Sequence, residues 1–427
     1  MMDLENYKDK ESLTIEECKE IMAANYGILD IAFTKIAELP KGLTVRRLNA
    51  HSTKLRSLPE GLTVRGTLDL SNSKIAELPE GFTVGYDLDL DHTDITELPE
   101  GLTVGGGLII SFTKITELPE GLTVRGSIIT KGTKIKKLSR DITVGGKLVV
   151  RSLNMTRLPE GLTVGGRLDL RNTRITELPE DFTVGGDLDL KCSSIEKLPK
   201  DLTVGGRLDI RNTRIKVLPE GLTVGDLDLS NIEITELPKS LTVKGDLDLS
   251  NTGITELPEG LTVGGSLILR NTRIKVLPEG LTVGGSLILS NTEITELPKS
   301  LTVSDSLDLS NTRISKLPEG LTVRSLDISN TEITDLPKGL TVSSSLDLSN
   351  TRISKLPKGL KLRKLFLSNS DVSKLPEDIK VRRVLNIKHT KITELPKRFT
   401  VKELIITREQ HDTSLLDNLK SARIYHR

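Results

Sequence analysis

The chain has 427 residues, and its 60 lysines and arginines nearly balance its 59 aspartates and glutamates. This balance excludes a general attraction to nucleic acid or membranes, although local charged patches stay open. Aromatic residues make up only 2% of the sequence, and tryptophan is absent. That composition argues against an enzyme and against a nucleic-acid binder that stacks bases on aromatic rings.

The N-terminus and the cysteine content bear on location. Residues 1–20, MMDLENYKDKESLTIEECKE, are acidic and contain no apolar stretch typical of a secretory signal peptide. No apolar run approaches the roughly 18 residues that span a bilayer. Cys18 and Cys192 are too few for a disulfide framework and fit a reducing compartment. We therefore expect a cytoplasmic protein, or one secreted without a signal peptide, and no transmembrane segment.

The first predicted element in chain order is a helix over residues 14–25. Thr14 and Glu17 have the spacing of a capping box, in which each side chain satisfies a backbone N–H at the start of a helix. Apolar residues then recur on one helical face, at Ile15, Cys18, Ile21 and Met22. We expect residues 1–27 to form an N-terminal helical cap.

A repeat of 19 or 20 residues fills residues 28–406 in about 19 copies. All 18 prolines follow a leucine at the same place in the unit, and Leu138-Ser139 is an eroded copy of that pair. The L-x-L segment predicts a short strand with two inward side chains. The proline predicts an extended rather than helical return path. The threonine or serine that ends the S-N-T segment is expected to hydrogen bond to the turn backbone.

The units resemble the short LPX-type leucine-rich repeats of bacterial effector proteins, including type III-secreted scaffold effectors. The resemblance implies a solenoid with a curved parallel β-sheet on its concave face, a mostly extended or irregular convex side and short helical caps. It also implies a binding scaffold. The frequent V-G-G insertion departs from this pattern, for example at Gly165-Gly166. Only about 20 residues follow the array, so the ubiquitin-ligase domain of some members is not expected.

Residues 407–427 are expected to form a C-terminal cap. Within them, residues 414–424 should be a short helix with an apolar face formed by Leu415, Leu416, Leu419 and Ile424.

Patterns of catalytic and metal-binding residues are missing from the sequence. The five histidines are scattered, without the spacing of a zinc site. Residues 141–148 resemble a phosphate loop superficially, but Leu148 replaces the magnesium-binding hydroxyl. Asp87, Asp89 and Asp91 share a strand face, and a hydrated acidic patch is favoured there over a weak cation site. We expect no enzyme, no cofactor and no metal centre.

The residue between the two inward leucines of each strand is expected to face the concave side. Aspartates at this position should point to water, with basic neighbours at Arg167, Arg171, Lys191, Arg207 and Arg211. They form either a solvated checkerboard of paired charges or a docking strip for a charged partner. Two breaks in the column expose apolar residues, which are either interaction patches or drift at a tolerant position, since isoleucine also favours strands. The candidate partner-binding residues are Ile109, Phe112, Ile129, Val149, Asp169, Asp189, Asp209, Asp228, Ile268 and Ile288.

The C-terminal repeats are basic, with 15 lysines or arginines and five acidic residues over 352–403. The candidate basic patch comprises Lys361, Arg363, Lys364, Lys380, Arg382 and Arg383. Such a patch fits nucleic acid, anionic lipid or an acidic protein. Without interleaved aromatic residues, sequence-specific RNA recognition is not expected.

Together these patterns predict a non-enzymatic protein-binding scaffold that uses its concave face, with secretion as an effector implied by the resemblance. Two alternatives stay open. One is a polyanion binder, for nucleic acid or anionic lipid, that works through the basic patch. The other is a structural or viral-particle component, in which near-identical copies such as 251–270 and 271–290 reflect duplication rather than tuned recognition.

Overall fold

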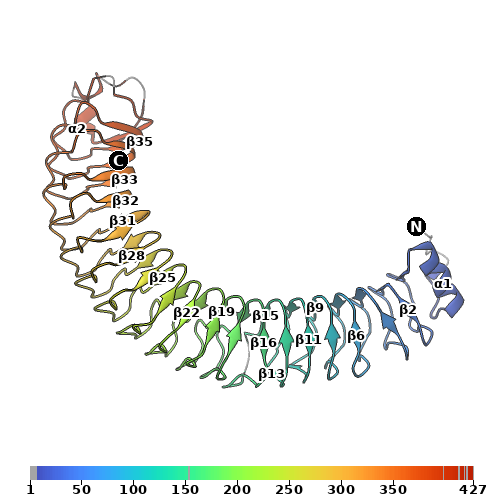
Figure 1. Cartoon of the computed structure of the whole chain (residues 1–427). Coiled ribbons are helices and arrows are strands. Elements are labelled where there is room, and N and C mark those ends of the chain that lie inside the picture. Colours follow the sequence, from blue (N-terminus) through green and yellow to red (C-terminus); the bar gives the residue numbers. More distant parts are fainter. Residues whose placement is uncertain are drawn as a thin grey trace. The chain divides into compact units, whose positions relative to one another are not determined.

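A computed structural model describes residues 7–151, 154–397, 399–411, 414–417, 419 and 422–426. The chain forms two compact units, Met1–Arg214 and Ile215–Arg427. Each unit is a stack of repeats whose strands lie side by side (Figure 1). The predicted division at residues 27 and 406 stays a prediction.

Helix α1 (Ile15–Ala24) begins the first unit and confirms the predicted N-terminal helix. Glu17 donates its backbone N–H to Thr14 Oγ1 at 3.2 Å, and Thr14 donates its N–H to the Glu17 carboxylate at 2.8 Å. Cys18 and Ile21 are fully buried, as the apolar face requires. Burial raises the pKa of the Cys18 thiol to about 11, so this thiol is protonated and unreactive at neutral pH.

The L-x-L segments form a parallel ladder of strands in each unit, as predicted. Adjacent repeats are in register, so that Leu168 pairs with Leu188 and Asp169 with Asp189. In the first unit the strands are β1 (Ile28–Asp30), β3 (Arg47–Asn49), β5 (Leu68–Asp69), β7 (Leu88–Asp89), β9 (Leu108–Ile109), β12 (Ile128–Ile129), β15 (Leu148–Val149), β17 (Leu168–Asp169), β19 (Leu188–Asp189) and β21 (Leu208–Asp209). In the second unit they are β23 (Leu227–Asp228), β25 (Leu247–Asp248), β27 (Leu267–Ile268), β29 (Leu287–Ile288), β31 (Ser306–Asp308), β32 (Thr322–Asp327), β33 (Thr341–Asp347), β34 (Lys361–Phe366), β35 (Lys380–Asn386), β36 (Glu403–Ile406) and β37 (Arg423–His426).

A second parallel ladder runs along the Thr-Val dipeptides, and the repeat pattern did not predict it. Threonine and valine are β-branched and favour extended backbone. The strands of the first unit are β2 (Thr44–Val45), β4 (Thr63–Val64), β6 (Thr83–Val84), β8 (Thr103–Val104), β11 (Thr123–Val124), β14 (Thr143–Val144), β16 (Thr163–Val164), β18 (Thr183–Val184) and β20 (Thr203–Val204). Those of the second unit are β22 (Thr223–Val224), β24 (Thr242–Val243), β26 (Thr262–Val263), β28 (Thr282–Val283) and β30 (Thr302–Val303).

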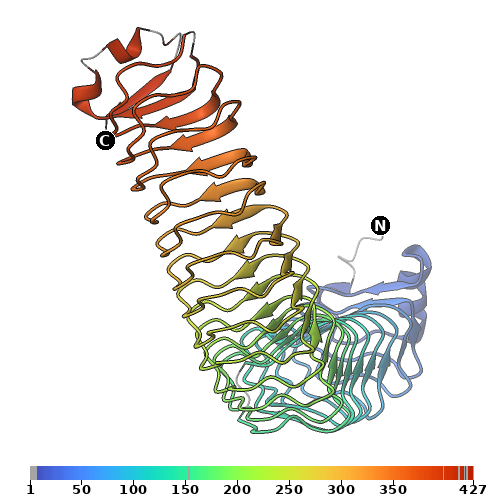
Figure 2. The ribbon, with the colours of Figure 1, turned by 60° about the vertical axis from the view of Figure 1, so that its left-hand side comes forward.

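Glycine between the two ladders lets neighbouring repeats approach closely. A Cβ atom on Gly185 would lie 2.2 Å from the carbonyl oxygen of Gly165, and one on Gly205 would lie 2.1 Å from that of Gly185. No side chain fits at these distances, which explains the recurrent V-G-G insertion. From β32 to β35 other residues replace these glycines, and the two strand segments merge into one longer strand (Figure 2).

Each repeat closes around an apolar core. Leu168, Leu170 and Ile175 are fully buried. Asn172 turns the chain in the left-handed region at φ 58°, which asparagine tolerates better than most residues. Thr173 Oγ1 donates a hydrogen bond to the Leu170 carbonyl at 2.7 Å, so the predicted bond from this hydroxyl to the turn backbone is confirmed. In the described residues, the helices lie only at the chain ends, and the return path is extended.

The eroded repeat forms an extra pair of strands, β10 (Glu117–Leu118) and β13 (Lys137–Leu138). Ser139, which replaces the usual proline, donates its backbone N–H to the Leu118 carbonyl at 3.0 Å. Its hydroxyl also bonds Glu117 Oε1 at 2.8 Å. Proline has no N–H to donate, so this substitution is what allows the pairing.

The C-terminal segment differs from the predicted helix over 414–424. The structure has helix α2 (Arg408–His411), the 3-10 helix η2 (Ser414–Leu416) and then strand β37. In β37, Ile424 pairs in parallel with Leu404 of β36. An unpaired strand edge offers backbone donors and acceptors, and the last residues satisfy them better as a strand than as a helix. None of the helices among the described residues is long and apolar enough to cross a bilayer.

The glycine spacing makes a stability prediction. Gly205→Ala should lower the free energy of unfolding by about 1–3 kcal/mol, because its Cβ would collide with the Gly185 backbone. The control is Gly107→Ala, whose Cβ would meet its nearest atoms at 3.5 Å. Urea denaturation followed by circular dichroism measures both. Equal losses in the two variants would show that close repeat stacking is not the cause.

Candidate functional site

Four of the strand-centre aspartates are buried, so the prediction that they point to water is wrong for these four. The other strand-centre aspartates are half-buried: Asp69, Asp89, Asp248, Asp308, Asp327 and Asp347. Asp169 is fully buried, and Asp189, Asp209 and Asp228 are only 5–6% exposed. Their Oδ1 atoms accept the backbone N–H two residues later, as at 3.3 Å from Arg171 to Asp169. This bond holds the chain where the strand turns, which gives the carboxylate a structural reason to recur in every such repeat.

Arginine side chains cover these aspartates. Arg171 donates from Nε and Nη2 to the two oxygens of Asp169 at 2.9 and 2.7 Å. Arg151 donates to Asp169 Oδ2 at 3.1 and 2.9 Å, and Arg167 bonds Asp189 at 2.7 Å. The predicted pairing is therefore confirmed for Arg167, Arg171, Arg207 and Arg211, whereas Lys191 makes no ion pair within the described residues. Arg151 is a member that the sequence analysis missed. The guanidinium groups are more exposed to solvent here than the carboxylates that they bond.

Burial and pairing have opposite effects on the carboxyl groups. Burial raises the pKa of Asp169, but hydrogen bonds from Arg171 and Arg151 outweigh it and hold this pKa well below its usual range. Asp189 shows the reverse: burial raises its pKa despite the N–H of Lys191. The ionised form of Asp169 is thus stabilised by its arginine partners.

An apolar patch, formed by Ile109, Ile129 and Val149, lies on adjacent strands of the first unit. Ile109 pairs in register with Ile129, and the neighbouring strand pairs Leu148 with Ile128. Ile129 is 47% exposed, while Ile109 and Val149 are half-buried. The structure thus brings together three of the predicted partner-binding residues.

A pocket of about 470 Å³ opens at the apolar patch. Its lining includes Ile129, Val149 and Thr130. Thr130 stands where the two neighbouring repeats carry Ile110 and Val150, and it donates a hydrogen bond to the Val149 carbonyl at 2.8 Å. Thr130 is half-buried, whereas Ile110 is fully buried and Val150 is 2% exposed.

An aromatic group adjoins the apolar patch. Phe112, another predicted site residue, is 45% exposed and stacks on His92 with 4.5 Å between ring centroids. Lys131, which lines the patch pocket, places Nζ 5.6 Å from the Phe112 centroid. Phe112 has φ 53° in the turn slot that asparagine fills in most other repeats. This conformation is unfavourable for a bulky residue, and Phe33 and His92 adopt it in the same slot. Gly132 accommodates the ring, because a Cβ on it would lie 2.6 Å from Phe112.

The second apolar break lies in the second unit. Ile268 and Ile288 pair in register on β27 and β29, and both are half-buried. Arg270 Nε donates to Ser290 Oγ at 3.2 Å beside them. They form a smaller patch of two residues.

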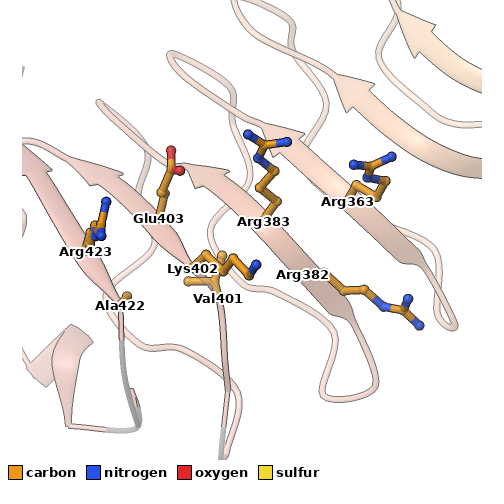
Figure 3. Close-up of a pocket in the computed structure, with 8 residues that line it drawn as sticks. All are labelled: Arg363, Arg382, Arg383, Val401, Lys402, Glu403, Ala422 and Arg423. Atoms are coloured by element: carbon orange, nitrogen blue, oxygen red, sulfur yellow. The ribbon is translucent and has the colours of Figure 1, made fainter.

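The basic patch is divided by the structure. Arg363, Arg382 and Arg383 line a groove, and the groove also contains Lys402 and Arg423, which the sequence analysis did not select (Figure 3). Lys402 occupies the same repeat position as Arg383, so repeat alignment could have found it. Repeat alignment does not identify Arg423 as a groove residue, because residues 414–424 are predicted to form a helix. Three further members, Lys361, Lys364 and Lys380, lie outside the groove lining.

The described residues contain no group of three or more His, Cys, Asp or Glu that could hold a metal ion. In the acidic segment, burial raises the pKa of Asp89, and Asp91 lies 3.0 Å from the ring of His92.

Comparison with solved structures finds similarity to YopM from Yersinia enterocolitica WA-314, with a TM-score of 0.57 and 20% identity over 96% of this chain and 94% of that one. The chain has the leucine-rich-repeat fold. Weaker matches are the leucine-rich effector protein YopM of Yersinia pestis (TM-score 0.38, 19% identity, 80% and 94% covered) and a Leptospira interrogans leucine-rich-repeat protein (0.36, 19%, 75% and 89%). Identity at this level shows the fold alone, and membership of the LPX subgroup stays an expectation. No protein-family model and no curated protein matches the chain.

The carboxyl pKa shifts predict opposite effects of two substitutions. Asp169 has a lowered pKa, so its charge stabilises the fold above about pH 4, and this is lost as pH falls through the lower folded value. Asp169→Asn should cost about 2 kcal/mol at pH 7. Burial raises the pKa of Asp327, so its ionised form opposes folding above that pKa. Asp327→Asn should leave stability equal or higher at pH 7.

Urea denaturation at pH 7 and pH 3 measures both variants. Asp327→Asn is the matched control, because its amide oxygen can still accept the bonds that Ser329 donates. Destabilisation of similar size in the two variants would contradict the assignment of Asp169 as the charge-paired member.

Proposed function

We propose that this protein is a non-enzymatic scaffold that binds a protein segment at the apolar patch and its pocket. The carrying observation is the pocket beside the exposed Ile129, at the repeat where Thr130 stands in place of the Ile110 and Val150 of its neighbours. An exposed apolar cluster over a concavity of about 470 Å³ offers room for one or two large side chains of a partner.

The strands around the patch are already ordered by their ladder bonds. Ile110 donates its N–H to the Ile129 carbonyl at 3.0 Å, and Ile128 donates to the Lys147 carbonyl at 2.9 Å. A surface that is ordered before binding loses little conformational entropy when a partner docks. Display of a rigid surface, rather than chemistry, is therefore the proposed mechanism.

The charges around the pocket indicate the kind of segment that fits. Lys131 and Lys147 line it together with the apolar residues, and Arg151 lies at the same rim while bonded to Asp169. Acidic residues next to an apolar side chain would complement these cations and orient the segment. The proposed ligand is therefore a protein segment with large apolar residues flanked by aspartate or glutamate.

The proposal includes a narrower point, namely that the protein is secreted as an effector. The repeat resemblance supports secretion, and cytoplasmic residence is the alternative. The arginines bonded to Asp169, Asp189 and Asp209 would extend the contact surface in the first unit, and Asp228, Ile268 and Ile288 would add contacts in the second.

A selection from random peptides displayed on phage tests the proposal. We expect enriched peptides to share one or two large apolar residues next to acidic ones. Ile129→Glu combined with Val149→Glu should weaken binding of a selected peptide by at least about tenfold, because both an apolar contact and the charge complementarity are lost.

The matched control is Val217→Glu combined with Val276→Glu, which adds the same two charges at exposed valines on the return path. Thermal denaturation confirms that both double variants fold. Equal loss of binding in the two double variants, or enriched peptides without apolar residues, would refute the apolar patch as the site.

A further inference from the structure

Four neighbouring strands of the second unit, β34 to β37, carry a groove lined mostly by positive charges (Figure 3). Its charged residues are Arg363, Arg382, Arg383, Lys402, Arg423 and Glu403, and Val401 and Ala422 complete the lining. Arg383 and Arg423 extend to the same side of their strands as Glu403 (Figure 3). This is the basic groove.

A β-bulge concentrates the arginines. Between β34 and β35, Leu362 pairs with Val381 and Lys364 pairs with Val384. Two residues of β35, Arg382 and Arg383, therefore stand opposite the single Arg363 of β34. A bulge changes side-chain direction locally, and here it adds one arginine to this pair of strands. Arg382 extends away from Arg383 (Figure 3).

The final strand completes the groove. Arg423 of β37 pairs in register with Glu403 of β36, and Val384 of β35 pairs with Glu403 from the other side. The position before Glu403 is Lys402, so its neighbour on β35 is Arg383. Strand β37 thus adds a fifth cation, Arg423, to the groove. Arg363 and Arg382 come forty or more residues earlier in the chain.

These cations are not neutralised within the described part of the chain. None of the five takes part in an ion pair there, whereas other basic residues of the same repeats do, such as Lys374 with Glu394 and Lys391 with Asp371. The lining thus contains five positively charged side chains and one carboxylate. Like charges at strand spacing repel one another, so the cluster favours an anion that neutralises it.

We propose that the basic groove binds a compact anion that carries two or more phosphate groups. Guanidinium groups match phosphate oxygens in paired hydrogen bonds, which lysine cannot reproduce. Four strands about 4.8 Å apart span about 14 Å, enough for two or three adjacent phosphates. Glu403 supplies an acceptor for a hydroxyl group of the same ligand.

The surroundings favour a compact ligand over a nucleic acid. On the N-terminal side of β34, the next strands carry Asp347 and Asp327, and Asp347 pairs directly with Phe366. A long polyanion that continued along the sheet would meet these carboxylates. None of the eight lining residues is aromatic, so the groove lacks a surface for base stacking. This site is in the second unit and is independent of the apolar patch.

Isothermal titration calorimetry of the full chain with sodium tripolyphosphate, at physiological ionic strength, tests the proposal. Wild type should bind with saturable heat. Arg383→Gln combined with Arg423→Gln should weaken binding by at least about tenfold, because two charge-assisted contacts are lost. Lys355→Gln combined with Lys358→Gln is the matched control, since it removes the same charge from exposed residues of the return path, and its affinity should stay within about twofold.

Thermal denaturation checks that each variant folds, and Arg363→Gln combined with Lys402→Gln replaces the first pair if that pair does not fold. Oligo-dT and polyglutamate are titrated in parallel. The proposal is overturned if wild type does not bind tripolyphosphate, or if both charge-matched variants lose affinity equally. Tighter binding of oligo-dT that grows with its length would make the site a nucleic-acid surface, and binding of polyglutamate alone would make it a site for acidic protein.

Discussion

Backbone-to-backbone stacking of successive repeats is the constraint on which the rest of the structure depends. Gly165, Gly185 and Gly205 show it directly, because the space for a Cβ atom is taken by the carbonyl of the preceding repeat. Such close contact holds both ladders in register within each unit. Register in turn aligns equivalent side chains into columns, so a single residue type repeated along the chain becomes a continuous feature of the surface.

The columns explain why the repeated residues are mostly structural. The strand-centre aspartate accepts the N–H that follows the strand, the turn asparagine takes the left-handed conformation, and the threonine hydroxyl bonds the turn carbonyl. The two proposed sites are instead built from departures from the repeat. A pocket opens beside Thr130, Phe112 occupies the turn slot at a conformational cost, and the β-bulge at Arg382 adds an arginine to the groove lining.

The two proposed surfaces use different physical chemistry on the same scaffold. At the apolar patch, desolvation of Ile129 and its neighbours would drive binding, with lysines for orientation. At the basic groove, electrostatic attraction and paired hydrogen bonds would dominate. A scaffold in which each repeat contacts mainly its neighbours can change locally without loss of the fold elsewhere, which allows distinct sites along one chain.

The sequence by itself determined the repeat, the strand at each L-x-L segment, the N-terminal helix, the extended return path and the positions of the apolar breaks. These follow from local periodicity, capping and the chemistry of proline, which act within one unit. Only the tertiary structure decided the burial of Asp169 and its ion pair with Arg151, because that arginine belongs to the preceding repeat. The same holds for Arg423, whose strand forms only when β36 offers it an edge. Contacts between residues about twenty positions apart depend on register and side-chain reach, and a single unit's pattern does not contain them.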